Sequence, residues 1–177
     1  MKAKPTFCFS SKILLPFVAF GACAGISYAQ TTRTWVGGGV PVTNMDLAAN
    51  WSPAGVPVTT APGDTAQWDG TVTGPLSITY TAAGTGASMS AAGSGIFFNV
   101  TGTQVDPLTI NCFSGTQGVR IQNFTVASGA GAVTLGGLAG ADNFNLGNTS
   151  VVNHVFTNNS ANPFTFQSDV SFSAGNA

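Results

Sequence analysis

Apolar and polar residues alternate along several segments of the second half of the chain. The alternation runs through 108–112 and 119–121, and a Phe-polar-apolar triplet then recurs every twenty residues. Alternation with a period of two predicts β-strands, and a triplet repeated at a fixed interval is typical of a solenoid. The three triplets are Phe124-Thr-Val126, Phe144-Asn-Leu146 and Phe164-Thr-Phe166.

This repeat predicts an all-β fold, a parallel β-helix. A unit of about twenty residues extends at most about 66 Å, which is enough for one turn around a core. Stacked turns would place equivalent side chains above one another, so we expect one internal column of phenyl rings with a second inward column two residues on. The alternative is a β-sandwich in which the spacing of twenty is a coincidence. The expected columns are Phe124, Phe144 and Phe164, and Val126, Leu146 and Phe166.

The region 30–80 differs from the repeats in composition. It contains all three tryptophans and most of the prolines of the chain, whereas every Phe after residue 30 lies at or beyond position 97. The end of a solenoid exposes strand edges and apolar core, so an atypical terminal unit must cover it. We therefore expect an N-terminal cap over 30–80, a Gly/Ala/Ser-rich connection or first coil over 81–103, and coils of about twenty residues over 104–177.

The repeat pattern still continues at Phe172, close to Ala177. We therefore expect Ala177 to interrupt a longer solenoid and the open end to associate with other molecules end to end.

The first 29 residues have the order of a secretory signal peptide. Three lysines precede an apolar run over 13–26, and small residues surround Ala29. This order predicts cleavage after Ala29 and no membrane span in the mature chain. A retained anchor helix and a lipoprotein acylated at Cys23 are the alternatives. Cleavage after Ala29 removes Cys8 and Cys23 and leaves Cys112 as the single thiol of the mature chain, so no intramolecular disulfide is expected.

The Trp-rich opening resembles a known family. Its segments are Thr34-Trp-Val-Gly-Gly-Gly39, Ala48-Ala-Asn-Trp-Ser52, Gly55-Val-Pro57, Pro62-Gly-Asp-Thr-Ala66 and Trp68-Asp-Gly70. Over about 34–70 the chain is similar to large exported bacterial proteins with autotransporter-associated β-strand repeats. The resemblance implies a β-solenoid that is secreted or displayed on the outer surface of a bacterium, and it supplies no catalytic set.

Charge narrows the range of partners. Only 6% of the residues are charged, and the formal net charge is −1. All three lysines lie in the first twelve residues, which leaves Arg33 and Arg120 as the later cations, against six Asp and no Glu. Nucleic-acid binding relies on many cations, so no nucleic-acid partner is expected.

The residues that commonly perform catalysis are few. His154 is the sole histidine, and its alternation with Phe156 predicts that it faces the interior; Cys112 is predicted to be a small core residue. Asp64 and Asp69 follow turn signals and are expected to be turn residues before Ca²⁺ ligands. We therefore predict no enzyme activity, no cofactor and no metal site. A polysaccharide lyase or hydrolase remains an alternative if stacking brings together Asp residues that are distant in sequence, such as Asp106, Asp142 and Asp169 near Arg120.

Three tryptophans in a Pro-rich segment are interpreted first as buried packing of the cap. The alternative is a carbohydrate-binding module in which Trp35, Trp51 and Trp68 stack on sugar rings. The favoured function is an exported, non-enzymatic solenoid for adhesion or structure. An extracellular polysaccharide or another cell surface would be its partner.

Overall fold

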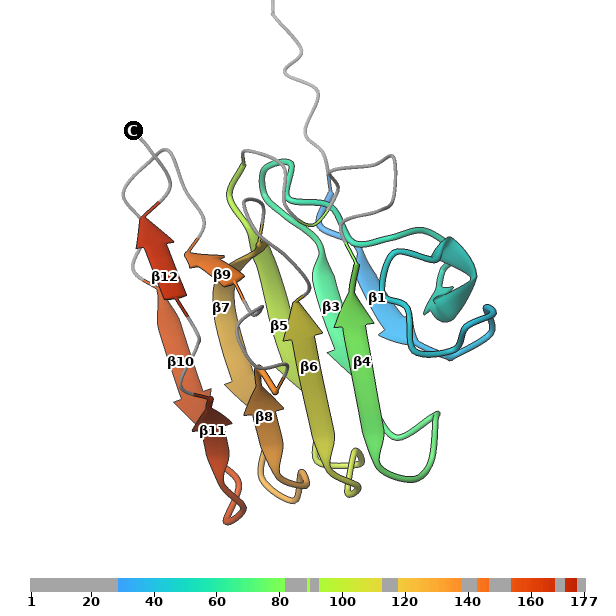
Figure 1. The fold of residues 1–177 in the computed structure, drawn as a ribbon, viewed down its shortest axis with the longest axis vertical. Coiled ribbons are helices and arrows are strands. Elements are labelled where there is room, and N and C mark those ends of the chain that lie inside the picture. The colour runs from blue at the N-terminus through green and yellow to red at the C-terminus, as the bar shows by residue number, and fades with distance from the viewer. Residues whose placement is uncertain are drawn as a thin grey trace, which may run out of the picture.

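A computed structural model describes residues 29–81, 89, 93–112, 118–137, 143–146, 154–167 and 171–174. Residues 1–28 of the predicted signal peptide therefore lie outside the described residues, as do Asp142, Asp169 and Ala177. In the described part, strands form two sheets (Figure 1). Sheet A contains β1 (Thr32–Trp35), β2 (Trp51–Ser52), β3 (Thr65–Trp68), β5 (Ile96–Val100), β7 (Val119–Val126), β9 (Asn143–Leu146), β10 (Val155–Asn158) and β12 (Ser171–Ala174). Sheet B contains β4 (Leu76–Tyr80), β6 (Leu108–Cys112), β8 (Val133–Leu135) and β11 (Phe164–Phe166).

The chain crosses from one sheet to the other and returns one step further along the stack. Sheet A has the order β12-β9-β7-β5-β3-β1-β2, with β10 also paired to β7, and sheet B has the order β11-β8-β6-β4. All these pairs are parallel except β1 with β2. The result is a β-solenoid of about three turns, which confirms the predicted parallel β-helix and excludes the β-sandwich.

The coils are longer than the predicted twenty residues. In sheet A, Thr32 pairs with Thr65, Thr65 with Phe97, Phe97 with Asn123, and Asn123 with Val155. These steps advance the chain by 33, 32, 26 and 32 residues. Each coil has to supply strands to both sheets as well as two turns, and twenty residues are too few for this path. Because β3 and β4 already belong to the parallel stack, the coils begin well before residue 104.

The predicted phenyl column is wrong for the same reason. Phe124 lies in sheet A and pairs with Phe98 and Phe156, whereas Phe164 lies in sheet B and pairs with Val133. Phe144 pairs with Val119 at the other end of β7. Residues that are twenty positions apart in the sequence therefore lie at different places on the coil and do not stack in one column. In the second predicted column, Val126 is buried, but Phe166 is 42% exposed and belongs to sheet B.

Alternating residues of both sheets meet in one core. Strand β3 buries Ala66 and Trp68, strand β5 buries three of its five residues, and β6 buries Leu108, Ile110 and Cys112. Cys112 is thus a core residue, as predicted. Apolar side chains at every second residue decide which face of each strand turns inward.

Aromatic rings form a continuous chain of contacts through this core. Ring centroids are 5.0 Å apart for Trp35 and Trp51, and 5.8 Å for Trp51 and Trp68. The chain continues from Trp68 to Phe98 at 5.3 Å and from Phe98 to Phe124 at 5.3 Å, all in edge-on geometry. Phe124 then contacts Phe164 of the opposite sheet at 4.7 Å. Edge-on pairs of this kind add stability beyond the area that they bury.

Residues 36–55, called the N-terminal cap below, close one end of both sheets. On sheet A, β2 adds an antiparallel strand beside β1, with Trp35 opposite Trp51. On sheet B, Asn44 bridges to Thr79, and the Met45 N–H donates to the Thr79 carbonyl at 3.0 Å. The cap thereby forms backbone contacts with the first parallel strand of each sheet, β1 in sheet A and β4 in sheet B. An atypical N-terminal cap is confirmed, although it is shorter than the predicted 30–80.

Glycines at one corner of the coil allow successive turns to approach closely. Gly63 has φ +84° and Gly95 has φ +92°, both in the left-handed region. A Cβ on Gly63 would collide with the Gly95 carbonyl oxygen, and one on Gly95 would lie 2.9 Å from the Gln122 nitrogen. Side chains at either glycine would therefore force adjacent coils apart.

Candidate functional site

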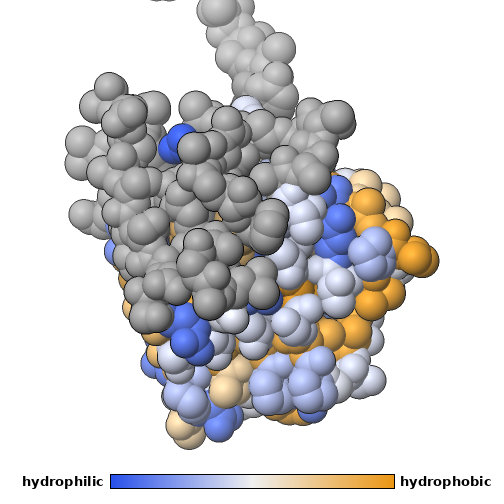
Figure 2. Space-filling model, viewed as in Figure 1, coloured by the Kyte–Doolittle hydropathy of each residue, from blue (hydrophilic) through white to orange (hydrophobic). Residues whose placement is uncertain are grey.

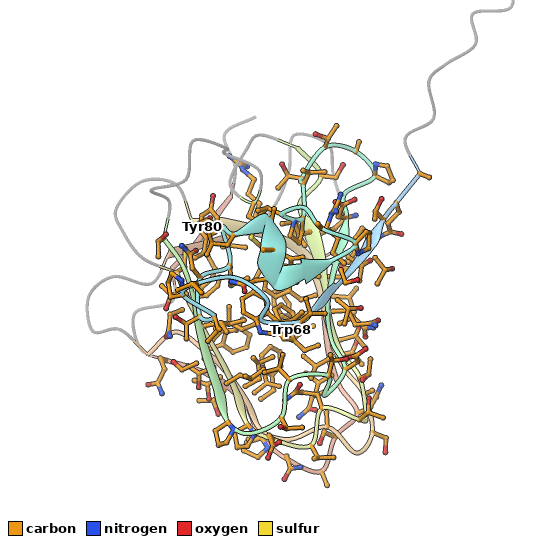
Figure 3. All side chains as sticks on the ribbon, turned by 90° about the vertical axis from the view of Figure 1, so that its right-hand side faces the viewer. Trp68 and Tyr80 are labelled. Atoms are coloured by element: carbon orange, nitrogen blue, oxygen red, sulfur yellow. The ribbon has the colours of Figure 1, made fainter. Side chains whose placement is uncertain are left out.

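The three tryptophans lie inside the protein. Trp35, Trp51 and Trp68 are 2%, 1% and 0% exposed, and the Trp51 indole N–H donates to the Met45 carbonyl at 2.9 Å. The rings pack edge-on against one another, and Figure 3 shows Trp68 among the side chains that fill the interior. Sugar stacking requires an accessible ring face, so this arrangement supports the packing interpretation and removes the indoles as a carbohydrate platform.

The buried amide of Asn50 holds the N-terminal cap together. Its Oδ1 accepts from the Gly39 N–H at 2.6 Å, and its Nδ2 donates to the carbonyls of Pro41 and Asn44 at 3.2 and 2.7 Å. One side chain thus satisfies three backbone groups of a loop that has few partners of its own, which is why an uncharged polar residue is tolerated at 0% exposure.

The four Asp residues that the structure describes all bind backbone N–H groups. Asp64 is 5% exposed and accepts from Thr31 and Val58 at 3.2 Å each, and its Oδ2 lies 2.9 Å from Nε of Arg33. This carboxylate stabilises the start of sheet A and has little room for Ca²⁺. Asp46 accepts from the Thr81 N–H, Asp69 accepts from the Thr71 N–H, and Asp106 accepts from the Gly74 N–H.

His154 directly precedes β10 and is half-buried, so it is less enclosed than the core residue that was predicted. Its Nδ1 lies 2.9 Å from the carbonyl oxygen of Gln122, so the ring donates there. Among the described residues, no group of three or more His, Cys, Asp or Glu could hold a metal ion.

The outer face of sheet A is the most regular polar surface of the described structure. The polar column consists of paired outward residues, one per coil: Thr34, Gln67, Asn99, Thr125 and Thr157. Beside it runs the mixed column: Thr32, Thr65, Phe97, Asn123 and Val155. The residues between these positions in β3, β5 and the second half of β7 are buried, which turns both columns away from the core.

Side chains of the polar column bond to one another along the stack. Gln67 Nε2 donates to Thr34 Oγ1 at 3.3 Å, and Asn99 Nδ2 donates to Gln67 Oε1 at 2.9 Å. Sequence reasoning missed this surface because the steps along the column are not constant. Asn99 follows Gln67 by 32 residues, but Thr125 follows Asn99 by only 26. The usable signal was the polar residue between two inward-facing residues in β3, β5 and β7.

Sheet B has a shorter outward column on the opposite side of the molecule. Ser77, Thr109, Thr134 and Thr165 pair in register. Its neighbour Asn111 is only 4% exposed, so part of this face is covered. Figure 2 shows this side of the molecule, with an apolar area at the right over the N-terminal cap, where Val40 and Val42 are 91% and 54% exposed.

No protein-family model matches the sequence, and no curated protein or solved structure matches it either. No helix among the described residues is long and apolar enough to cross a membrane. The arguments for function therefore rest on the chain itself.

Proposed function

We propose that the protein is an exported, non-enzymatic β-solenoid that serves as a rigid structural or adhesive element outside a bacterial cell. The observation that carries the proposal is the stack of in-register parallel coils with a continuous aromatic core and uncharged outer columns. A stack of this kind presents neutral side chains at every step of these columns and resists bending because each coil is hydrogen-bonded to the next.

Export is supported by the sequence. Lysines, an apolar run and small residues follow one another in the first 29 positions, in the order of a signal peptide. The Trp-rich opening supports the same conclusion through its resemblance to exported proteins with autotransporter-associated repeats. The four described carboxylates all accept structural hydrogen bonds, which favours a scaffold over a lyase or hydrolase.

Expression with its own leader in a bacterium, followed by cell fractionation and amino-terminal sequencing, tests the proposal. We expect a product outside the cytoplasm that begins at Gln30. A product that keeps Met1 and stays in the cytoplasm would refute it, and one that begins at Cys23 would identify a lipoprotein. Activity on acidic or neutral glycans that is lost in Asp106→Asn would replace the structural role by an enzymatic one.

A further inference from the structure

We propose that the outer face of sheet A binds a neutral polysaccharide along its polar and mixed columns. The inference rests on the proposed function, because such polymers are met outside the cell. The proposed binding surface consists of the two columns that the stacking of the coils creates, and it does not include the three tryptophans.

The geometry of this face suits an extended polymer. Successive side chains of a column are about 4.8 Å apart, and the two columns are about 6.7 Å apart along each strand. Both columns have five members in register. Strand β1, blue in Figure 3, lies with its sheet on the right, and side chains project outward from that side, away from sheet B.

The polar column is ordered before any ligand arrives. The bonds from Asn99 to Gln67 and from Gln67 to Thr34 fix both amides in one orientation. These two bonds leave Oδ1 of Asn99 and the second hydrogen of each amide unused. Amides and hydroxyls that are already held in place lose less conformational entropy on binding than mobile side chains do.

The chemistry of the face matches that of sugar rings. Sugar hydroxyls both donate and accept hydrogen bonds, as do the Asn, Gln and Thr side chains of the polar column. In the mixed column, the half-buried ring of Phe97 lies between Thr65 and Asn123. An aromatic ring beside hydrogen-bonding groups offers an apolar contact for the C–H face of a sugar.

Charge selects a neutral polymer over an acidic one. None of the ten column residues is charged. Arg33 is paired with Asp64 beneath the N-terminal cap, and Arg120 lies before the columns on β7. Acidic polysaccharides and anionic lipid surfaces would need a group of cations on this face. A second copy of the chain fits poorly, because one phenyl ring and one valine among eight polar residues provide little of the apolar core that protein interfaces have.

Pull-down of the purified protein on microcrystalline cellulose, chitin and insoluble β-1,3-glucan, with alginate beads as the acidic comparison, tests the inference. Phe97→Thr and Asn99→Ala change the sheet A face, and Thr134→Val is the matched control on the outer face of sheet B. Thr at position 97 keeps strand propensity, so the fold is expected to persist. Circular dichroism and thermal unfolding of each variant verify that it does.

We expect at least one neutral polysaccharide to retain the protein and the Thr134→Val control, with retention insensitive to salt. Phe97→Thr and Asn99→Ala should each weaken retention about tenfold, the effect of removing one central contact. The inference is overturned if no neutral polysaccharide retains the protein, if both folded variants bind as well as the control, or if alginate alone binds. It is also overturned if sedimentation shows a dimer that Phe97→Thr dissociates.

The outcome is separable from that of the proposed function. An exported protein that binds none of these polymers refutes the inference and leaves the structural role standing. A protein retained in the cytoplasm refutes the proposed function, whatever it binds in the pull-down.

Discussion

The cap end of the described stack buries its aromatic rings, whereas the strands at the opposite end leave theirs partly exposed. Trp35, Trp51 and Trp68 are at most 2% exposed, while Phe156 and Phe164 are half-buried and Phe166 is 42% exposed. All six belong to the same chain of ring contacts. An alternating strand pattern thus selects inward-facing rings, but the degree of burial depends on what covers them.

The N-terminal cap produces its burial through backbone hydrogen bonds as well as apolar contacts. Asn50 bonds three backbone groups, and Asp46 Oδ2 accepts from both the N–H and the hydroxyl of Thr81, at 2.8 and 2.6 Å. These bonds fix an irregular loop over the first coil. Stability should therefore be concentrated toward the cap, and substitutions along the ring chain should have graded effects.

The largest effect is expected from Trp68→Ala. The indole is 0% exposed and contacts both Trp51 and Phe98, so its removal leaves a cavity inside the first coils. A loss of about 3–5 kcal/mol in the free energy of unfolding is expected from chemical denaturation. Trp68→Phe is the control, since it keeps a ring and removes an indole N–H that has no acceptor among the described residues. Equal losses for the two variants would contradict the packing argument.

A smaller loss is expected from Asn50→Ala, which opens the cap without removing any ring. Three backbone groups lose their partner, and the Gly39 N–H is left in a buried place. We expect a loss of about 2–3 kcal/mol, together with faster amide hydrogen exchange at Gly39 and Met45. Exchange rates that remain those of the original protein would show that apolar contacts alone hold the cap.

The smallest loss is expected from Phe166→Ala at the other end. The ring is 42% exposed and contacts Phe164 at 4.9 Å, so only part of its area is removed from water. Thermal unfolding should report a loss of about 1 kcal/mol or less. A loss as large as that of Trp68→Ala would mean that both ends of the stack are equally packed, and the comparison between them would fail.

Sequence reasoning reached the fold class but not the register of the coils. Alternation around Leu108 and Ile110 predicted strands with one inward face, and the burial of both residues agrees with it. The interval between Phe124 and Phe144 suggested a coil length that the parallel pairing corrects. A recurrence in sequence reports similar local environments, and a solenoid coil contains several of these.

For the outer face of sheet A, too, the sequence predicts the local pattern of each strand but not the register between strands. Strands β3, β5 and β7 each have a recognisable polar residue between two buried ones, as Gln67 lies between Ala66 and Trp68 in β3. Nothing in the local sequence places Gln67 beside Asn99, because the turns between them differ in length from coil to coil. The hydrogen bond between the two amides exists only once the strands have been set in register.

The sequence by itself determined that the chain would form strands, which residues of each strand would turn inward, and that the Trp-rich opening would differ from the coils. These properties are local, since they depend on side-chain alternation and composition over a few residues. Only the tertiary structure decided the coil length, the partners of Phe124 and the two outer columns of sheet A. Those properties depend on hydrogen bonds between strands some thirty residues apart, and the turns set the register in which these bonds form.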